Sequence, residues 1–146
     1  MLNKIASLKT MQISRYHIIA LLLFSNYVVL AAEPSLDALI KDLTAGNAPA
    51  QATARQMLPR QGIKAVPKLI PLLESESKAV SKTVYYILLD IANQACAPGK
   101  NAERRAVTDG LMILVKPGRS EDEKVRGLEL LWRVVPEGYD IGPIAA

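Results

Sequence analysis

The sequence predicts an all-α fold in which three helix pairs follow an N-terminal leader. Residues 65–92 read as two amphipathic helices joined by a polar turn, because their apolar side chains recur at spacings of three and four. The flanking segments carry imperfect copies of this pattern. A single helix pair leaves one apolar side uncovered, so the copies are expected to stack on one another.

The leader has the organisation of an export signal. A basic segment precedes an apolar run at 18–30, and Val29-Leu30-Ala31 places small residues where a signal peptidase reads the chain. We therefore interpret residues 1–31 as a signal peptide and expect a periplasmic or secreted protein. An uncleaved membrane anchor through residues 18–30 is the alternative, but this run is shorter than the roughly 20 residues that span a bilayer.

The leader also accounts for the basic character of the chain. The whole sequence holds 18 Lys and Arg against 14 Asp and Glu. Without Lys4, Lys9 and Arg15, 15 bases remain against 14 acids, which is a net charge of +1. This balance argues against nucleic-acid binding. We expect contact with a membrane only through the leader during export.

The mature region, residues 33–146, is expected to form one domain of three units. The units lie at 35–62, 63–92 and 102–138, and residues 93–101 read as an irregular insertion with a Pro-Gly turn. Insertions in repeat stacks map to one edge of the stack.

The first unit is expected to begin with a helix at 36–43, for which Ser35 is a natural N-cap and Gly46 a C-cap. Its second helix, at 50–58, aligns with the central unit at a shift of thirty residues. The small side chains of this helix favour close packing, and Gly62 closes the unit.

The central unit begins with an apolar stripe at 66–73, in which Pro71 removes a backbone hydrogen bond and is expected to bend the helix. Ser77 is the expected N-cap of the second helix, whose apolar stripe runs from Val80 to Ile91. Tyr85 and the adjacent Tyr86 point to different sides, so that one can lie in the core and the other outside.

The third unit is expected to begin with a helix at 102–115 and to end before Pro136. Ser120 and Glu123 have the spacing of a capping box, which marks the start of the last helix. At a shift of 44 residues from the central unit, the expected core stripe of this helix consists of Leu128, Leu131, Trp132 and Val135.

The run AVPKLIPLL at 65–73, a polar turn and V-x-x-x-V-x-x-x-L-x-x-x-A from Val80 to Ala92 together form a recognisable motif. It resembles the HEAT repeat, especially the short HEAT-like form of phycobilin-lyase-type repeats. The second-helix Arg of that family occurs only as Arg126, since Gln51 and Ser81 occupy the equivalent places. The resemblance implies a right-handed α-α superhelix, an armadillo-like solenoid of about three HEAT-like repeats, which presents a binding surface and has no catalytic role.

The mature chain offers little catalytic chemistry. The only histidine, His17, lies in the leader, so that Ser-His and Cys-His pairs are excluded. Cys96 is the only cysteine, which rules out a cysteine-based zinc site, and we expect it to be buried. Glu74, Glu76 and the acidic residues 121–123 lie in turns or at helix starts, where a structural role is usual. We expect no enzyme, and no catalytic, cofactor-binding or metal-binding residue.

The outward residues of the second helices form the candidate partner-binding face, because these helices often line the concave side of such stacks. A basic and apolar strip suits an acidic peptide or protein segment. An ordinary solvated surface with amphipathic Lys and Arg stems is the alternative. The candidate residues are Lys78, Lys82, Tyr86, Leu89, Arg126, Leu130 and Arg133.

The sequence thus predicts an exported, non-catalytic repeat scaffold that binds a protein partner. Two alternatives stay open. The chain is a non-catalytic or regulatory subunit of an enzyme of the phycobilin-lyase type, or it is a fragment of a longer solenoid, as the apolar ending IGPIAA suggests. Neither the partner's identity nor an oligomeric state follows from these patterns.

Overall fold

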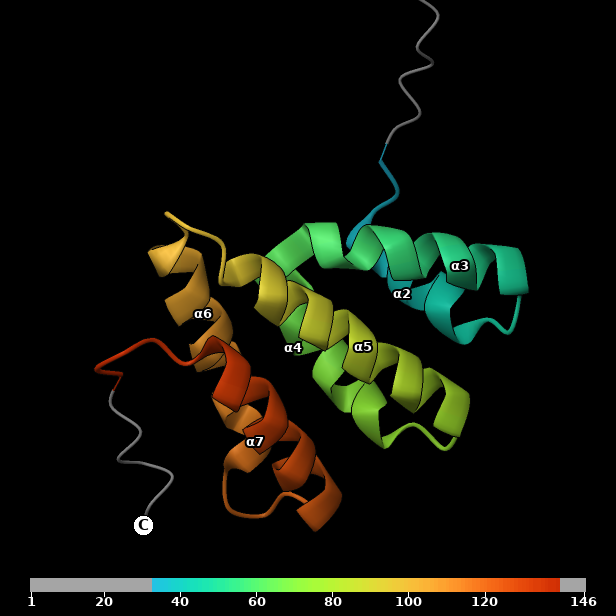
Figure 1. The fold of residues 1–146 in the computed structure, drawn as a ribbon. Helices are drawn as coiled ribbons and strands as arrows, with labels where there is room; N and C mark the ends of the chain where they lie inside the picture. The colour runs from blue at the N-terminus through green and yellow to red at the C-terminus, as the bar shows by residue number, and fades with distance from the viewer. Residues whose placement is uncertain (1–32, 140–146) are drawn as a thin grey trace, which may run out of the picture. The chain divides into compact units, whose positions relative to one another are not determined.

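The computed structural model describes residues 33–139 of the chain (Figure 1). These residues form six α-helices and three short 3₁₀ helices, and no β-strand occurs among them. The predicted all-α class is therefore confirmed for this part of the protein. The expected signal peptide at 1–31 and the apolar ending at 141–146 lie outside the described residues.

The helices make three pairs in chain order. α2 packs against α3, α4 with its continuation η2 packs against α5, and α6 with its continuation η3 packs against α7. The second pair lies between the other two (Figure 1). The helices are α2 (Leu36–Thr44), α3 (Ala48–Met57), η1 (Leu58–Lys64), α4 (Val66–Leu69), η2 (Ile70–Glu74), α5 (Lys78–Ala95), α6 (Asn101–Leu111), η3 (Met112–Val115) and α7 (Glu121–Val134).

Three helices begin at the serines that the sequence predicted as N-caps. The hydroxyls of Ser35, Ser77 and Ser120 each accept a hydrogen bond from a backbone N–H three residues later, at 3.2, 3.4 and 3.2 Å. Glu123 completes the capping box, because its carboxylate accepts a hydrogen bond from the Ser120 backbone N–H at 3.2 Å. These caps satisfy donors that a helix start would otherwise leave unpaired.

Pro71 interrupts the first helix of the second pair, as its missing N–H predicts. α4 ends at Leu69, and the tighter 3₁₀ helix η2 continues from Ile70 to Glu74. The expected insertion is shorter than the sequence indicated, because α5 continues to Ala95, whose side chain is buried. Only residues 96–100 connect α5 to α6.

The first two pairs repeat one specific contact. The Gln51 side-chain amide donates a hydrogen bond to the Leu43 carbonyl at 3.3 Å, and the Ser81 hydroxyl donates one to the Leu73 carbonyl at 2.6 Å. In both pairs a side chain of the second helix satisfies the carbonyl of the last buried leucine in the first helix. The two contacts lie thirty residues apart, which is the shift that the apolar pattern predicted.

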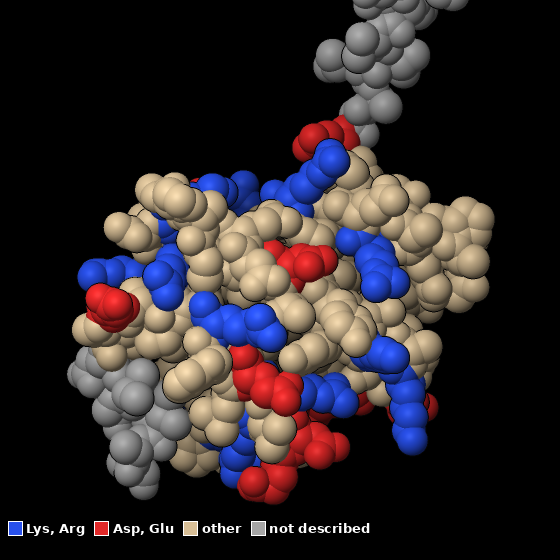
Figure 2. Space-filling model, in the orientation of Figure 1, with Lys and Arg blue, Asp and Glu red and all other residues tan. Residues whose placement is uncertain are grey.

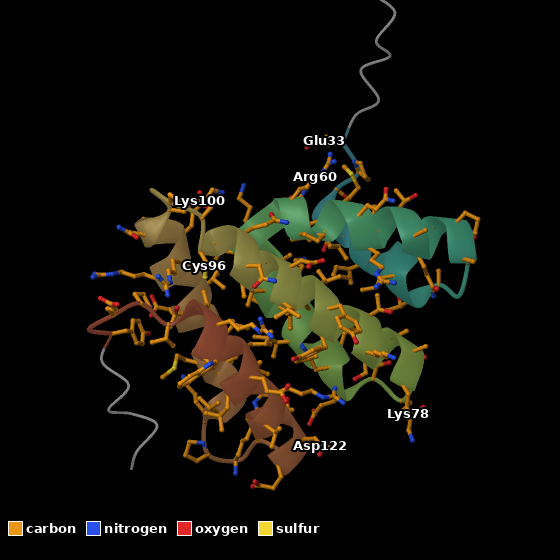
Figure 3. The ribbon with its side chains drawn as sticks, in the orientation of Figure 1. Glu33, Arg60, Lys78, Cys96, Lys100 and Asp122 are labelled. Carbon is orange, nitrogen blue, oxygen red and sulfur yellow. The ribbon has the colours of Figure 1, made fainter. Side chains whose placement is uncertain are left out.

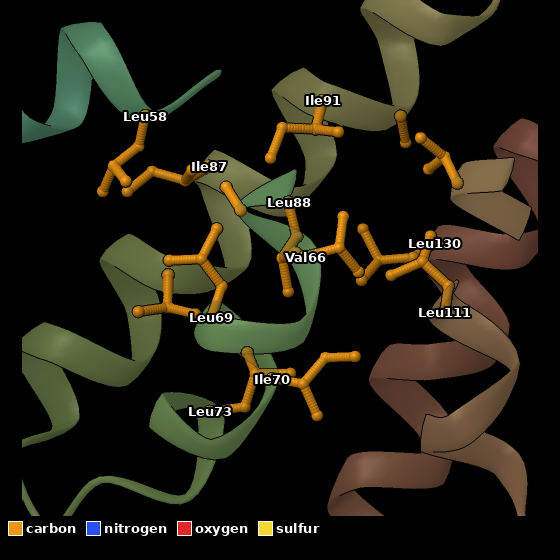
Figure 4. Close-up of a cluster of buried hydrophobic side chains, with 14 of the residues drawn as sticks. Leu58, Val66, Leu69, Ile70, Leu73, Ile87, Leu88, Ile91, Leu111 and Leu130 are labelled. Atoms are coloured by element: carbon orange, nitrogen blue, oxygen red, sulfur yellow. The ribbon is translucent and has the colours of Figure 1, made fainter. Parts of the chain in front are cut away.

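One hydrophobic core joins the three pairs (Figure 4). It runs from Leu58, after α3, through the stripe that includes Val66 and Leu69, to Leu111 and Leu130 of the third pair. All five side chains are fully buried. Because every pair contributes side chains to the same core, no pair buries its apolar stripe alone.

The rotation of α7 differs from the prediction. Leu128 and Trp132, which were expected in the core, are 51% and 90% exposed. The buried residues align with Val84, Ile87, Leu88 and Ile91 of α5 at a shift of 43 residues instead of 44. A shift of one residue turns a helix by about 100°, which carries Trp132 from the core to the surface. The buried α7 residues of this set are Gly127, Leu130, Leu131 and Val134.

Gly127 explains why the shift is 43. A Cβ atom at this position would lie 2.6 Å from the Leu114 Cβ and 3.1 Å from a Val115 methyl. α7 therefore approaches η3 at a distance that only glycine permits. An apolar pattern does not register glycine as a core residue, and the neighbouring Leu128 drew the prediction to the wrong face.

Cys96 also differs from the prediction, because it is exposed. It follows Ala95, the last buried residue of α5, and therefore points away from the core side. Its thiol donates a hydrogen bond to the Arg133 carbonyl at 3.3 Å.

We predict that Gly127→Ala destabilises the protein by about 1–3 kcal/mol, because the added methyl group overpacks the contact with Leu114. Gly110→Ala is the matched control, since its added Cβ would meet only side-chain methyl groups at 3.2 Å. This control should change the stability by less than about 1 kcal/mol, as helix propensity offsets the crowding. Urea unfolding followed by circular dichroism measures both. Equal stability of the two variants would contradict the close approach of α7.

Candidate functional site

The second helices of the three pairs line one face of the molecule. In Figure 1, α3, α5 and α7 lie in front of α2, α4 and α6. Figure 2 shows basic side chains spread across this face and several acidic side chains over α7. Lys78 and Asp122 lie at the starts of α5 and α7 (Figure 3).

Three of the four residues predicted on α5 reach the surface, and Leu89 does not. Lys78 and Lys82 are exposed, and Tyr86 is 40% exposed. Leu89 is half-buried, with its side chain packed against the core. Tyr86 stacks edge-on against Tyr85, with the ring centroids 5.7 Å apart. The expectation that one tyrosine lies inward and the other outward is confirmed, since Tyr85 packs against the core.

The residues predicted on α7 do not form the expected strip. Leu130 is fully buried, so its place in a partner-binding face is wrong. Arg126 is half-buried, and its guanidinium donates hydrogen bonds to the Ser81 hydroxyl at 2.7 Å and to the Leu73 carbonyl at 3.2 Å. It joins the second and third pairs instead of meeting solvent. Of the three predicted residues, Arg133 alone is exposed.

The line between α5 and α7 is closed by side-chain contacts. The Tyr85 hydroxyl donates a hydrogen bond to the Glu129 carboxylate at 2.9 Å, beside the Arg126 contact with Ser81. Burial raises the pKa of Tyr85, and the hydrogen bond to the negatively charged Glu129 raises it further. This part of the face therefore holds no open groove for a ligand.

The line between α3 and α5 is open. A groove of about 700 Å³ lies there, lined by residues of both helices. Within residues 33–139, no hydrogen bond or ion pair joins the side chains of α3 and α5. The polar part of the lining consists of Gln51, Arg55, Gln56, Arg60, Asp90 and Gln94.

The groove exists because the α3 residues that face α5 are small or polar. Tyr85 of α5 turns toward the third pair, and Leu89, one turn later on the same side of the helix, packs against the core. The positions thirty residues earlier are Arg55 and Pro59, and both line the groove. The Arg55 guanidinium and the Pro59 ring leave open the space that corresponds to Tyr85 and Leu89 in the next pair. As a result, α3 and α5 stay apart.

The chemistry of the groove suits a polar chain with negative charge. Glutamine side chains both donate and accept hydrogen bonds, which matches the backbone groups of an extended peptide. Arg55 and Arg60 place two guanidinium groups along the lining against the single carboxylate of Asp90. Arginine pairs with carboxylates through two parallel hydrogen bonds. The sequence prediction missed Arg55 of α3 and Arg60 of η1, although the shift of thirty residues identifies both positions once α5 is placed.

The acidic residues considered for acid-base chemistry lie at or next to helix ends. Glu74, Glu76 and Asp122 are exposed, and Glu121 pairs with Lys124 at 2.8 Å. Glu123 is 3% exposed. It caps α7 and accepts a hydrogen bond from Arg119 at 2.9 Å.

The pKa of Glu123 reflects these contacts. Burial raises it, but the hydrogen bond from the Ser120 backbone, together with the hydrogen bond and the positive charge of Arg119, outweighs burial. The pKa is therefore held below the usual glutamate value. A carboxylate that stays ionised in this way stabilises the helix start, which agrees with the structural role expected for this cluster.

Residues 33–139 contain neither a cluster of metal-ligating side chains nor a membrane-spanning helix. No group of three or more His, Cys, Asp or Glu side chains is placed to hold a metal ion in this range. None of its helices combines the length and the apolar character needed to cross a bilayer. The apolar run at 18–30 lies outside the range.

Comparisons with known proteins give no relative. No protein-family model matches the chain, and neither a curated protein nor a solved structure is similar to it.

We predict that Glu123→Gln lowers the stability by about 1–2 kcal/mol near neutral pH, because the charge-assisted hydrogen bonds are lost. The folded pKa lies below the unfolded value, so this contribution is complete above the ordinary glutamate pKa of 4.5 and is lost as the pH falls through the folded pKa. The wild type and the variant should therefore converge in acid. Urea unfolding at several pH values measures this, with the exposed Glu121→Gln as control. A difference that stays constant from neutral to acidic pH would contradict the assignment.

Proposed function

We propose that this protein is an exported, non-catalytic scaffold whose helix pairs form a short HEAT-like solenoid and bind a protein partner. Three features support the solenoid: a shared core, helix pairs in chain order, and the Gln51 and Ser81 contacts repeated at thirty residues. In such solenoids each unit contacts its neighbours in sequence and the second helices form an extended binding surface.

The open groove between α3 and α5 is the observation that carries the proposal. Its volume of about 700 Å³ lies within the range of ligand sites, roughly 300–1,000 Å³. The lining is polar along much of its length, with two arginines and three glutamines. This composition favours an extended peptide segment over an apolar small molecule.

The partner segment is acidic. Arg55 and Arg60 line the groove, and α5, which forms its other wall, also carries the exposed Lys78 and Lys82. Tyr86 adds a partly exposed aromatic ring on the same helix. Basic side chains around a groove speed the approach of an acidic partner and fix its register. The function of the chain is then to hold an acidic segment of another exported protein.

Site-specific photocrosslinking in living cells tests the binding face. A photoreactive amino acid replaces Gln56, which lines the groove and is exposed, or Lys41, which is exposed on α2. We expect a discrete protein adduct from position 56 and none from position 41. The same adducts from both positions, or none from position 56, would sink the proposal.

Charge reversal in the groove provides the matching functional test. We predict that Arg55→Glu with Arg60→Glu lowers the adduct yield at position 56 about tenfold, which corresponds to roughly 1.4 kcal/mol of binding free energy. Lys41→Glu with Lys116→Glu changes the net charge equally and should leave the yield unchanged, because both lysines lie outside the groove. Circular dichroism checks that all variants fold.

We also predict that the cell processes the chain between Ala31 and Glu33, because the small residues before this point suit a signal peptidase. Intact mass spectrometry of protein from the cell envelope or the medium measures this. An intact leader on protein that stays in the cytoplasm would exclude export, and an intact leader in the membrane fraction would favour an anchor through residues 18–30.

A further inference from the structure

α7 carries an exposed apolar stripe on the side opposite its buried residues. Val125 is 54% exposed, Leu128 51% and Trp132 90%. Their spacings of three and four residues place them on one face of the helix. We call these three residues the α7 stripe. Exposed apolar residues that stand singly are ordinary, but a contiguous set with a tryptophan marks an interaction site.

Two of the three stripe positions are covered in the preceding second helix. Leu128 and Trp132 correspond to Tyr85 and Leu89 of α5 at the observed shift of 43 residues. Tyr85 reaches α7 through Glu129, and both α5 residues are half-buried against the core. In α7 the same positions face outward, and no further helix follows within residues 33–139.

The first helix of the third pair, α6 with its continuation η3, also exposes an apolar residue whose equivalent in the second pair is packed against the core. Ile113 of η3 corresponds to Leu72 of η2 at the shift of 41 residues that aligns the buried Leu114 with Leu73. Leu72 is half-buried against the core, whereas Ile113 is 38% exposed. Both helices of the third pair thus expose residues whose equivalents in the second pair are covered.

The opposite end of the stack is closed. Among residues 33–139, the exposed large hydrophobic side chains are Tyr86 of α5, Ile113 of η3 and the α7 stripe. α2 and α3 contribute none. Within the described residues, a copy of this chain therefore offers the stripe no large exposed apolar side chain on α2 or α3, and head-to-tail stacking of copies is disfavoured. The best apolar match on a second copy is the stripe itself, which makes the contact two-fold symmetric.

Charges beside the stripe fit an antiparallel pair of α7 helices. Asp122 and Arg133, both exposed, lie on one flank near opposite ends of the helix. A two-fold axis close to Leu128 sets Val125 against Trp132 of the second copy and Asp122 against its Arg133. Glu129, near the centre, is held toward α5 by the Tyr85 hydroxyl. The pair therefore gains two opposite-charge contacts around an apolar centre.

We propose that the α7 stripe is the interface through which two copies of this chain associate, with their α7 helices antiparallel. The interface is small, since a tryptophan contributes about 150–250 Å² and its two neighbours less. Interfaces well under the standard size are weak, and we expect a dissociation constant in roughly the micromolar range. The groove between α3 and α5 lies away from the α7 stripe and stays open in this dimer.

Trp132 is the only tryptophan, so its fluorescence reports on the stripe directly. The protein is expressed from its full-length gene and purified in the processed form that the cell yields. We expect sedimentation velocity to show a monomer that becomes a dimer as the concentration rises. The tryptophan emission should move to shorter wavelength over the same range. A monomer with unchanged emission at high concentration would overturn the proposal.

Two substitutions test the face itself. Leu128→Asp should abolish the dimer without unfolding the monomer, because Leu128 is already half-exposed. Tyr86→Asp, at the exposed hydrophobic residue on α5, is the matched control and should leave the dimer intact. A dimer that survives Leu128→Asp, or that is lost only in Tyr86→Asp, would place the interface elsewhere.

A charge swap distinguishes a second copy from any other cover. Asp122→Arg should weaken dimerisation about tenfold or more through repulsion from Arg133 of the second copy. Adding Arg133→Asp to the same chain should restore it. Failure of this rescue would exclude the antiparallel arrangement. A different outcome would show that the C-terminal residues cover the stripe. In that case the Trp132 emission would lie at short wavelength even at high dilution, and the double substitution Ile141→Asp with Ile144→Asp would move it to long wavelength. This result would contradict the proposal.

Discussion

The contact between Gly127 and Leu114 determines how the third helix pair faces its surroundings. The orientation of a packed helix about its long axis is set by the point at which it approaches its neighbour most closely. Because α7 meets η3 at a position where a Cβ would come within 2.6 Å of the Leu114 Cβ, its buried side is set by Gly127, Leu130 and Val134. The same rotation directs Arg126 to Ser81 and sends Trp132 outward.

One positional rule then describes the face of the second helices. Equivalent positions on α3, α5 and α7 turn toward the next second helix, and the side chains there decide what forms. Arg55 and Pro59 line a groove, Tyr85 makes a contact with α7, and Leu128 with Trp132 stays uncovered. A polar ligand groove and an apolar docking face thus arise from the same position in successive units.

Much of the fold was predictable from local patterns. Serine caps, the proline break and apolar spacings of three and four act within a few residues, so the sequence indicates helix starts, the interruption at Pro71 and the stripe from Val66 to Leu73. The rotation of α7 was not predictable in this way. It depends on the distance between η3 and α7, which is short because Gly127 has no side chain. A pattern of apolar side chains does not reveal such a contact.

The candidate site was predicted only in part, for the same reason. Lys78, Lys82 and Tyr86 were placed correctly on the surface because α5 was in register. Leu130 was misplaced through the one-residue error in α7, and Arg126 was assigned to solvent although it bonds the Leu73 carbonyl. The groove could be predicted only if the separation of α3 and α5 were known. That separation follows from the space that Arg55 and Pro59 leave open, and no sequence motif indicates it.

Acrylamide quenching of Trp132 in the folded, highly diluted protein tests the rotation of α7 most directly. The indole is 90% exposed in the monomer, so its quenching constant should approach that of the urea-unfolded chain. A quenching constant several-fold lower at the highest dilution would mean that Trp132 is covered within a single chain. The orientation of α7 set by Gly127, or the free face derived from it, would then be contradicted.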